Sequence, residues 1–353
     1  MALTRFAEAK EPGFMKKQVS TSMIAQEAGI AVSTTGFILS GKARKMKISE
    51  KTEKRVLAIA KDLGYVPNAL AKNLRRNRSG IIGLLYNHLK HHWADESLKG
   101  VRRVLGDTEY APFLSTHEFD ASLLEREVDL MLQHRFDAII SVPFKEGRES
   151  YQRIIDNGTP LIFLNDTIDG MSEVDVVAWN AREASKTAIE HLLSLGRRKI
   201  AFIGWEDKRR MMRARVNAYR SLLGKAGIAI REDWIRLYPL DANIADGVND
   251  LFCGPSAPDA LFCGLDIYGI QAIGALEGMG LRVPEDVAVM GMGNQPGSEF
   301  PSIGLSTVNS PNEQIGARAA ALAIELIERK KREKGARHLL RGDELVIRRS
   351  TLI

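Results

Sequence analysis

Residues 19–42 read VSTSMIAQEAGIAVSTTGFILSGK, and this segment holds two short helical patterns on either side of a glycine. In the first, residues 20–28, apolar residues share one helix face, a hydroxyl side chain stands at the start as N-cap, and Gly29 stands at the stop. The second pattern can begin with Ser33 or Thr34 as its N-cap. Two short helices joined by a glycine-containing turn predict a helix-turn-helix, whose second helix enters the DNA major groove.

The pattern of a third helix follows, starting after Ser49 as N-cap and stopping at Gly64. Its predicted apolar stripe consists of Val56, Leu57, Ala60 and Leu63. Three such helices can close a small core. Beyond them, Pro67 can open about two turns of helix ending at Leu74, which is too short to be stable alone in water and would order on contact with a partner.

Charge divides the chain into a basic head and a slightly acidic remainder. Residues 1–80 contain 16 Lys and Arg against 6 Asp and Glu, whereas the other 273 residues contain 34 against 38. A basic module ahead of a large globular segment indicates nucleic-acid binding by the head, although a solvated lysine-rich helix face would give the same charge. Residues 1–18 show no apolar periodicity, so we expect a mobile extension there.

Length and composition exclude several classes of protein. With 353 residues, of which 44% are hydrophobic and 27% charged, the chain has an ordinary soluble composition and sequence for two or three domains. The most apolar stretch, residues 260–276, is interrupted by Asp266, so no membrane span is expected. Residues 1–17 lack the apolar core of a secretory signal, which favours the cytoplasm. Cys253 and Cys263 are expected to be free, buried thiols.

From Ile81 onward, short apolar runs alternate with helical patterns, as is typical of parallel α/β sheets. The predicted strands cover residues 81–85, 113–115, 138–142, 161–164, 199–203, 260–263 and 287–291. Helices such as those expected at 181–195, 216–226 and 267–279 supply the crossovers. The length fits two doubly wound lobes, and such sheets bind ligands beyond the carboxyl ends of their strands.

Taken together, three segments resemble the lac repressor/galactose repressor (LacI/GalR) family of bacterial transcription regulators. They are the helix-turn-helix segment quoted above, the run ISEKTEKRVLAIAKDLGYVPNALAKNL at residues 48–74, and the closing LVIRRST at residues 345–351. A helix-turn-helix pattern alone is weakly specific, but one followed at this interval by GYVPNALAKNL and then by a long α/β segment is strongly specific.

The resemblance implies how the head meets DNA. Base edges would be read by Val32 and Ser33, and phosphates contacted by Ser20, Thr21, Thr34 and Tyr65. Residues 68–74 would form a hinge helix in the minor groove, entered at Asn68, with Leu74 wedged into the central base step beside Ala71. Unstacking that step costs roughly a few kcal/mol, which the wider contact of bent DNA offsets. Packing on the effector domain is the alternative for Leu74.

Two features of the head depart from the family pattern. Phe37 stands where a base-reading arginine is usual, preceded by Gly36 in place of a serine. A phenylalanine cannot make the bidentate contact to guanine, so it would touch a thymine methyl or join the core, and the operator would differ from common family operators. The basic loop at residues 42–47, KARKMK, is longer than usual, and phosphate contact and a solvated loop are its two interpretations.

For the α/β segment, the resemblance implies a periplasmic-binding-protein-like core with a small-molecule effector between two lobes. The residues matched to the effector site are His92, Trp93, Thr116, Ser141, Asp166, Arg209, Arg215, Phe262, Asp266 and Asn294. Arg215 lies in RVNAYR, which resembles the family's R-L-x-G-Y pattern. Three others have structural alternatives, since Asp166 could brace a loop, Asp266 could begin a helix, and Arg209 lies in the exposed run KRR.

Two positions lack carboxylates that the family commonly offers to ligands. Trp179 replaces the aspartate of an aspartate-asparagine pair and joins the predicted effector contacts, and Gly293 replaces an effector-binding aspartate. Neither an indole nor a hydrogen atom can accept hydrogen bonds from ligand hydroxyls. A neutral sugar is therefore disfavoured, and the aromatic residues with two arginines favour an anionic or aromatic effector, such as a sugar phosphate or a carboxylic acid.

Two other classes compete with a regulator. The glycine-rich residues 291–297 suggest a nucleotide-cofactor oxidoreductase, but their spacing is wrong for G-x-G-x-x-G, Pro296 intervenes, and they lie late in the chain. A transport-type solute-binding protein would explain the α/β part but not the basic head. The sequence holds no P-loop, no G-x-S-x-G motif and no metal-spaced His and Cys cluster, so no enzyme, cofactor or metal is expected.

The sequence thus predicts a cytoplasmic repressor that acts as a homodimer or a tetramer. Its expected parts are the extension at 1–18, a helix-turn-helix domain at 19–66, a hinge helix and linker at 67–79, and an effector-binding and dimerisation domain of two lobes at 80–353. Two heads in a symmetric dimer would read the half-sites of a pseudo-palindromic operator. A small-molecule effector would change that affinity by binding two lobe arrangements differently.

Overall fold

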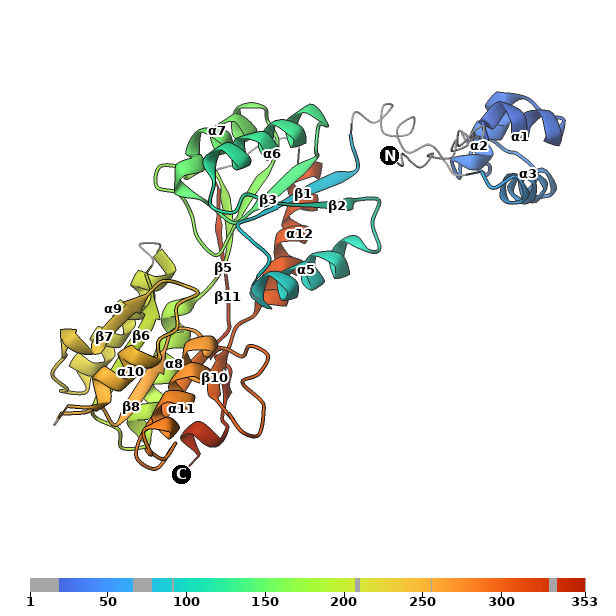
Figure 1. Cartoon of the computed structure of the whole chain (residues 1–353). Coiled ribbons are helices and arrows are strands. Elements are labelled where there is room, and N and C mark those ends of the chain that lie inside the picture. Colours follow the sequence, from blue (N-terminus) through green and yellow to red (C-terminus); the bar gives the residue numbers. More distant parts are fainter. Residues whose placement is uncertain are drawn as a thin grey trace, which may run out of the picture. The chain divides into compact units, whose positions relative to one another are not determined.

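The structure of the chain is a computed structural model that describes residues 19–65, 78–90, 92–206, 210–254, 256–329 and 335–352. These residues belong to two compact units that divide after residue 77 (Figure 1). The expected extension at 1–18, the hinge-helix residues Asn68, Ala71 and Leu74, and the predicted effector contact Arg209 lie outside the described residues. Within the described part, no helix is long and apolar enough to cross a membrane.

The head unit consists of three helices, α1 (Thr21–Ala28), α2 (Val32–Leu39) and α3 (Glu50–Asp62). Ser20 and Ser49 cap α1 and α3, because each side chain accepts a hydrogen bond from the backbone N–H three residues further on. Gly29 ends α1 in the left-handed conformation, which glycine adopts without strain, so the predicted turn is confirmed. The core of this unit comprises Ile24, Ala28, Ile38, Ala43, Val56 and Ala60.

Two details of the head differ from the prediction. α2 begins at Val32 with Ala31 as N-cap and no side-chain cap, so neither Ser33 nor Thr34 caps it. On α3, Leu57 and Leu63 are 45% and 39% exposed, because only two residues of the expected stripe are buried against the other helices. Because Ser33 does not cap α2, its hydroxyl lies on the exposed first turn of that helix.

The core unit, from Arg78 on, has two lobes, each built on a six-stranded sheet. The first sheet has the order β11-β5-β4-β3-β1-β2, and all its pairs are parallel. Its strands are β1 (Ile81–Tyr86), β2 (Ala111–Thr116), β3 (Ala138–Ser141), β4 (Leu161–Leu164), β5 (Asp175–Trp179) and β11 (Arg337–Leu340). Its helices are α5 (His92–Leu105), α6 (Ala121–Gln133), α7 (Arg148–Asp156) and α12 (Asn312–Glu328), with a 3-10 turn at Lys145–Gly147.

The second sheet repeats this order as β12-β10-β9-β8-β6-β7, with β12 antiparallel to β10. Its strands are β6 (Ile200–Trp205), β7 (Ile235–Tyr238), β8 (Ala260–Cys263), β9 (Ala288–Gly293), β10 (Ser306–Asn309) and β12 (Leu345–Val346). Its helices are α8 (Ala181–Ser194), α9 (Arg210–Lys225), α10 (Ala245–Phe252) and α11 (Asp266–Gly278), with 3-10 turns at Glu232–Trp234 and Arg349–Thr351. All predicted strands are present, and the expectation of two doubly wound lobes is confirmed.

The chain passes between the two lobes three times. It crosses after β5, returns after β10 so that α12 packs on β3, β4 and β5 of the first sheet, and crosses again after β11. β5 and β11 are neighbours in the first sheet and lead together toward the second lobe (Figure 1). The last helix and strands of the chain therefore complete both lobes.

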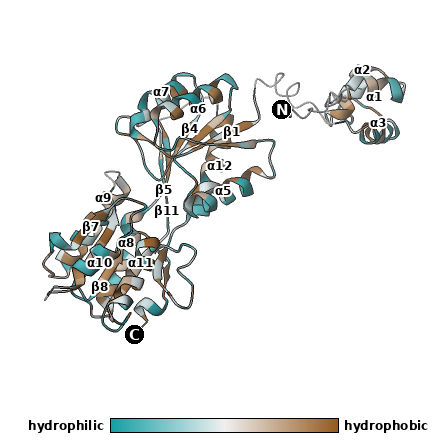
Figure 2. Cartoon of the chain, in the orientation of Figure 1, coloured by the Kyte–Doolittle hydropathy of each residue, from teal (hydrophilic) through white to brown (hydrophobic). Residues whose placement is uncertain are grey.

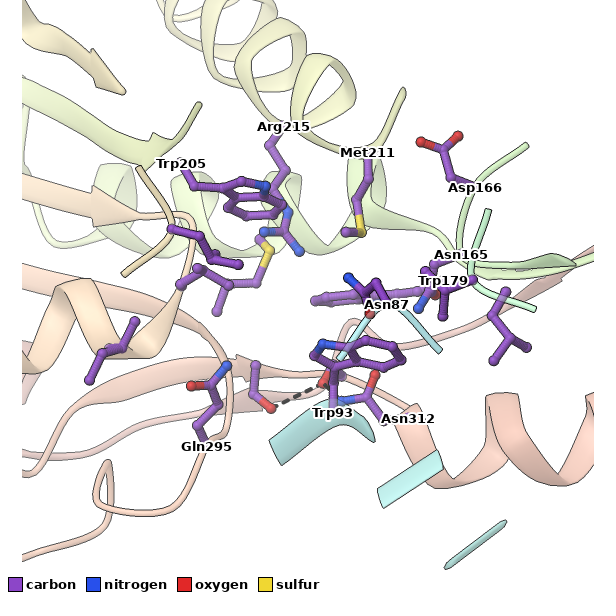
Figure 3. A pocket seen from close by; sticks show the side chains of 18 of the residues that line it. Asn87, Trp93, Asn165, Asp166, Trp179, Trp205, Met211, Arg215, Gln295 and Asn312 are labelled. Carbon is purple, nitrogen blue, oxygen red and sulfur yellow. Dashed lines mark hydrogen bonds between the residues drawn. The ribbon is translucent and has the colours of Figure 1, made fainter. Parts of the chain in front are cut away.

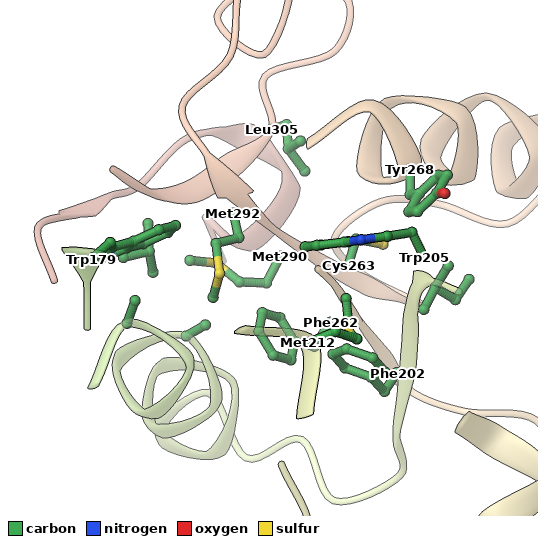
Figure 4. Packing of buried hydrophobic residues seen from close by; sticks show 14 of the residues in the cluster. Trp179, Phe202, Trp205, Met212, Phe262, Cys263, Tyr268, Met290, Met292 and Leu305 are labelled. Atoms are coloured by element: carbon green, nitrogen blue, oxygen red, sulfur yellow. The ribbon is translucent and has the colours of Figure 1, made fainter. Parts of the chain in front are cut away.

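The strands carry most of the apolar residues, whereas outer helices such as α6 and α7 carry many hydrophilic ones (Figure 2). In the second lobe, the rings of Phe202 and Phe262 meet edge to face with centroids 5.4 Å apart (Figure 4). Cys263 is buried beside them, but Cys253 is exposed just after α10, so the expectation that both thiols are buried is wrong for Cys253. Neither cysteine is in a disulfide.

Candidate functional site

A pocket of about 110 Å³ lies at the carboxyl ends of the strands of both sheets (Figure 3). The strand ends and following loops of the first lobe contribute Asn87, His88, Val142, Leu164, Asn165, Asp166 and Trp179, and those of the second contribute Trp205, Leu240, Leu265, Met292, Gly293, Gln295 and Ser310. Helices add Trp93, Met211, Arg215, Ile267 and Asn312. This is the edge at which doubly wound sheets bind ligands, so the pocket lies where the strand pattern predicts a site.

The guanidinium of Arg215 is held between two indole rings of this pocket. Its central carbon lies 4.7 Å from the ring centroid of Trp205 and 5.4 Å from that of Trp179. The side chain is 2% exposed, and its Nη1 donates a hydrogen bond to the backbone oxygen of Gly264. Because arginine keeps its charge in proteins, the pocket has a fixed positive charge stabilised by aromatic faces.

Two tryptophans are fixed in place by neighbours outside the pocket. Trp93 stacks on Tyr86, with ring centroids 5.5 Å apart and 12° between the ring planes. Burial raises the pKa of Tyr86 to about 12, so this support is neutral, and its hydroxyl lies 2.8 Å from that of Ser97. Trp179 Nε1 donates to the backbone oxygen of Gly342 at 2.7 Å. Trp179 therefore offers ring surface rather than its N–H group as pocket wall.

Amide and hydroxyl groups make up the polar part of the lining. Asn312 Nδ2 lies 2.6 Å from Ser310 Oγ, which in turn donates to the backbone oxygen of Gly293 at 3.1 Å. Asn165 follows β4 in the left-handed conformation, with φ of 66°, which asparagine tolerates better than most residues. Its Oδ1 is buried without a hydrogen-bond partner, so a ligand donor reaching it would relieve an unsatisfied acceptor.

Asp166 lines the pocket, but its carboxyl group lies at one side of it, apart from the tryptophans and Arg215 (Figure 3). Oδ1 accepts a hydrogen bond from the backbone N–H of Thr167 at 2.9 Å. This geometry matches the alternative in which the carboxylate braces its loop.

The structure brings together Trp93, Asp166, Trp179 and Arg215 among the predicted effector contacts. It places six others away from the pocket lining: His92, Thr116, Ser141, Phe262, Asp266 and Asn294. His92 points along α5 toward Glu96, at 3.7 Å, and Thr116 ends the edge strand β2. Ser141 and Phe262 are fully buried in their lobes, because both faces of a parallel strand are covered. These six residues lie outside the lining of this pocket, and the effector contacts expected of them stay predictions that the pocket does not support.

The carboxylate of Asp266 braces the fold beside the pocket. It accepts hydrogen bonds from Thr307 Oγ1 and from the backbone N–H of Gln295, both at 2.6 Å, and so ties the start of α11 to β10 and to the pocket loop after β9. Burial raises the pKa of this carboxyl group, against the lowering effect of those hydrogen bonds. Asn294, on the same loop, is occupied too, because its Oδ1 accepts from Arg348 Nη2 at 2.8 Å.

The sequence reasoning missed several lining residues, chiefly Asn87, Asn165, Trp205, Gln295, Ser310 and Asn312. Asn87, Asn165 and Trp205 lie within two residues of the carboxyl ends of predicted strands, and that placement alone could have identified them. Ser310 and Asn312 follow β10, a strand that the sequence pattern did not predict.

In the head, the residues expected to read bases lie at the exposed start of α2. Val32 is 51% exposed and Ser33 is exposed, whereas Phe37 is half-buried near the end of the helix. Thr21 and Tyr65 lie together, with 3.4 Å between their hydroxyl oxygens. The first turn of α2 is therefore free to enter a groove.

The basic loop after α2, residues 42–47, is anchored to the head. Ala43 is fully buried in the core of the head, and the backbone N–H groups of Lys42 and Ile48 bond to Phe37 and Ala43 oxygens at 2.8 and 2.9 Å. The four basic side chains, Lys42, Arg44, Lys45 and Lys47, are exposed. The loop thus presents clustered positive charge on a fixed backbone.

Comparison with known proteins agrees with both parts of this arrangement. A model of bacterial regulatory proteins of the lacI family matches residues 23–68, and one of a periplasmic binding protein-like domain matches residues 189–351. The probable regulator EndR of Paenibacillus polymyxa is 26% identical over 314 residues, covering 88% of this chain and 91% of that protein. The probable repressor ExuR of Bacillus subtilis is 28% identical over 345 residues, covering 94% of this chain and 98% of that protein.

Among solved structures, the lac repressor dimer bound to operator and the anti-inducer ONPF shares the fold, with a TM-score of 0.80 at 20% identity over 96% of this chain and all of that one. A complex of the transcriptional regulator CelR with cellobiose has a TM-score of 0.69 at 23% identity, covering 94% of this chain and all of that one. The family consists of transcription regulators rather than enzymes. With its helix-turn-helix head and two-lobed core, the chain belongs to the lacI family of bacterial regulatory proteins and is a DNA-binding transcription regulator.

Proposed function

We propose that this regulator is a repressor that binds a two-fold-symmetric operator as a dimer, and that a small molecule in the pocket sets its affinity for DNA. The proposal rests mainly on the pocket, because residues of both lobes line it. The same chain has a helix-turn-helix head. A ligand held by both lobes binds one lobe arrangement better than another, and that difference is what shifts an equilibrium. The relatives PurR of Pasteurella multocida and ExuR of Bacillus subtilis are named as repressors.

We assign the recognition of DNA bases to the start of α2. Val32 and Ser33 would contact base edges, with Val32 suited to a thymine methyl, and Phe37 would add apolar contact instead of an arginine-guanine pair. Phosphates would be contacted by Ser20, Thr21, Thr34 and Tyr65 and by the four basic side chains of the 42–47 loop. The family resemblance adds the hinge residues Asn68, Ala71 and Leu74 in the minor groove. The regulator would act where the DNA is, in the cytoplasm.

For the effector, the pocket chemistry favours an anion that also has a flat or aromatic part. Arg215 supplies the positive charge, and Trp93, Trp179 and Trp205 supply ring surface. Among the described lining residues Asp166 is the one carboxylate, and it accepts a hydrogen bond within its own loop, so the acceptors offered to a ligand are mainly neutral amide oxygens such as Asn165 Oδ1. A carboxylate or phosphate is the natural partner of a desolvated guanidinium.

The dimer interface is assigned to exposed apolar side chains of the core unit. Phe113 and Leu114 on the edge strand β2 are 38% and 39% exposed, and Phe300 of the second lobe is 58% exposed. Exposed apolar surface of this kind commonly marks contact with another chain. Functionally, the chain would divide into a head at 19–66, a hinge and linker at 67–79, and an effector-binding and dimerisation part at 80–353.

Selection of bound sequences from a random DNA pool, with the full-length protein at near-physiological salt, tests this function. Recovery of a two-fold-symmetric site would support the repressor and supply a duplex for effector screening. If binding is weak, sequence-independent and steeply salt-dependent, the selection is repeated with sugar phosphates and aromatic carboxylates, because a co-repressor would then be needed. Failure with every compound would contradict the proposal.

A further inference from the structure

Two helices of the first lobe lead from the pocket to the opposite edge of the sheet. Trp93 on the first turn of α5 and Asn312 at the start of α12 both line the pocket. α5 connects β1 to its parallel neighbour β2, and α12 precedes the parallel strand β11, so both helices end where those strands begin. With 14 and 17 residues they span roughly 21 and 25 Å.

These two helices cross in direct backbone contact at Gly100 and Gly316. A Cβ on Gly316 would lie 1.8 Å from the backbone oxygen of Ser97, and one on Gly100 would lie 1.9 Å from that of Glu313. An ion pair of 3.0 Å between Arg103 and Glu313 adds to the contact. Because packed interiors leave no slack at such a crossing, a displacement of the pocket end of either helix is passed to the other.

At the far edge of the sheet, Arg78 contacts the ends of both helices. Its Nη1 donates to the hydroxyl of Tyr110, which follows α5, at 3.0 Å, and its Nη2 donates to the backbone oxygen of Ile327, in the last turn of α12, at 3.2 Å. The last carbonyls of a helix lack intrahelical partners and carry partial negative charge, so they favour a cation. Arg78 lies in the predicted linker at 67–79, and its guanidinium is engaged with the core.

The chain next to Arg78 is fixed to the same edge of the sheet. The carboxylate of Asp137 accepts hydrogen bonds from the backbone N–H groups of Ser79 and Gly80, at 3.0 and 2.7 Å. Arg78 and the two residues after it are thus held by the core at the point where the described core unit begins.

We propose that Arg78 is the positioning residue that couples the pocket to the DNA-binding head, through the crossed pair α5 and α12. The inference rests on the proposed function, since it assigns the route by which pocket and operator affect each other. A ligand against Trp93 and Asn312 shifts the starts of the two helices, and Arg78 passes that shift to the chain leading to the head. Because coupling is reciprocal, DNA bound to the head must also alter the pocket ends of these helices.

Hydrogen-deuterium exchange of the full-length protein, free and saturated with the selected operator duplex, tests this coupling without a known effector. In the wild type, we expect the duplex to protect the head and to change exchange at residues 92–98 and 310–316 by about fivefold or more. In Arg78→Gln, the head should still be protected at saturating duplex, while the change at the pocket ends is lost. Tyr110→Phe, which removes one acceptor, should lose part of it.

The matched control is Arg102→Gln, which removes the same charge from the exposed face of α5 and should behave as wild type. Thermal denaturation shows whether Arg78→Gln still folds. If it does not, Arg78→Lys takes its place, because lysine keeps the positive charge but cannot contact Tyr110 and Ile327 at the same time. If the wild type shows no head protection, the proposed function fails. If head protection occurs but the pocket ends do not respond, or respond equally in Arg78→Gln, the coupling inference is overturned.

Discussion

The substitution Gly316→Ala should destabilise the core unit, although alanine is the better helix former. In the interior of α12, alanine gains about 1 kcal/mol over glycine in helix propensity. Against this, the new Cβ would lie 1.8 Å from the backbone oxygen of Ser97, and a backbone atom cannot swing aside as a side chain can. To reach ordinary contact the two helices must separate by roughly 1.5 Å, which forfeits much of their packing energy.

Overpacking costs about 1–3 kcal/mol, and the upper end applies here because the obstacle is backbone, so the net loss should be roughly 2 kcal/mol after the propensity gain of about 1 kcal/mol. For a domain of this size, that loss lowers Tm by about 5 °C. The matched control is Gly274→Ala, an exposed position inside α11 with no atom within 4 Å of the new Cβ, which should be stabilised by about 0.5–1 kcal/mol. Thermal and urea denaturation of both variants measure the difference. A Gly316→Ala protein as stable as the wild type would refute the close crossing.

Four further predictions follow from the site and the head. In calorimetry, Arg215→Gln should lower the affinity for an anionic effector at least tenfold, because hydrogen bonds to charged groups contribute about 1.5–3 kcal/mol. Tight binding of a neutral sugar that the substitution does not affect would contradict an anionic effector. Lys45→Gln should reduce the salt slope of DNA binding by about 1, whereas Lys225→Gln in the core unit should leave it unchanged. Leu74→Ala should weaken specific binding far more than non-specific binding, and equal losses on both DNAs would count against the wedge. Hydrogen bonds from Arg282 lower the pKa of Asp286 from 3.8 to about 2. The contribution of Asp286 to stability is therefore present above pH 3.8 and is lost as the pH falls through about 2. The Tm difference between wild type and Asp286→Asn should vanish over that range.

Much of the fold could be predicted because buried parallel strands are short apolar runs. Of the missed strands, β7 has exposed residues, and β11 and β12 are partly exposed edge strands. β5, with the sequence DVVAW, was also missed, although four of its five residues are buried. β10, with the sequence STVN, is too polar and too short to stand out. Because β10 was missed, the return of the chain to the first lobe as α12 could not be foreseen.

The candidate site could be predicted only in part, for a related reason. Position along a strand decides whether a side chain reaches the pocket, and Phe262 and Ser141 lie within strands whose two faces are both buried. Arg215 was found because it lies in a recognisable motif on α9. Trp205 could have been found from its place just after a predicted strand, whereas Asn312 follows β10, which the sequence pattern did not predict.

The most direct test of the account compares binding of the full-length protein to the selected symmetric duplex and to a duplex in which one half-site is scrambled. At near-physiological salt, with mass measured on the complex, we predict two chains on the intact duplex and a loss of affinity of about 10³-fold or more on the scrambled one. Equal affinity for the two duplexes, or a single chain on the intact site, would contradict recognition by a symmetric dimer.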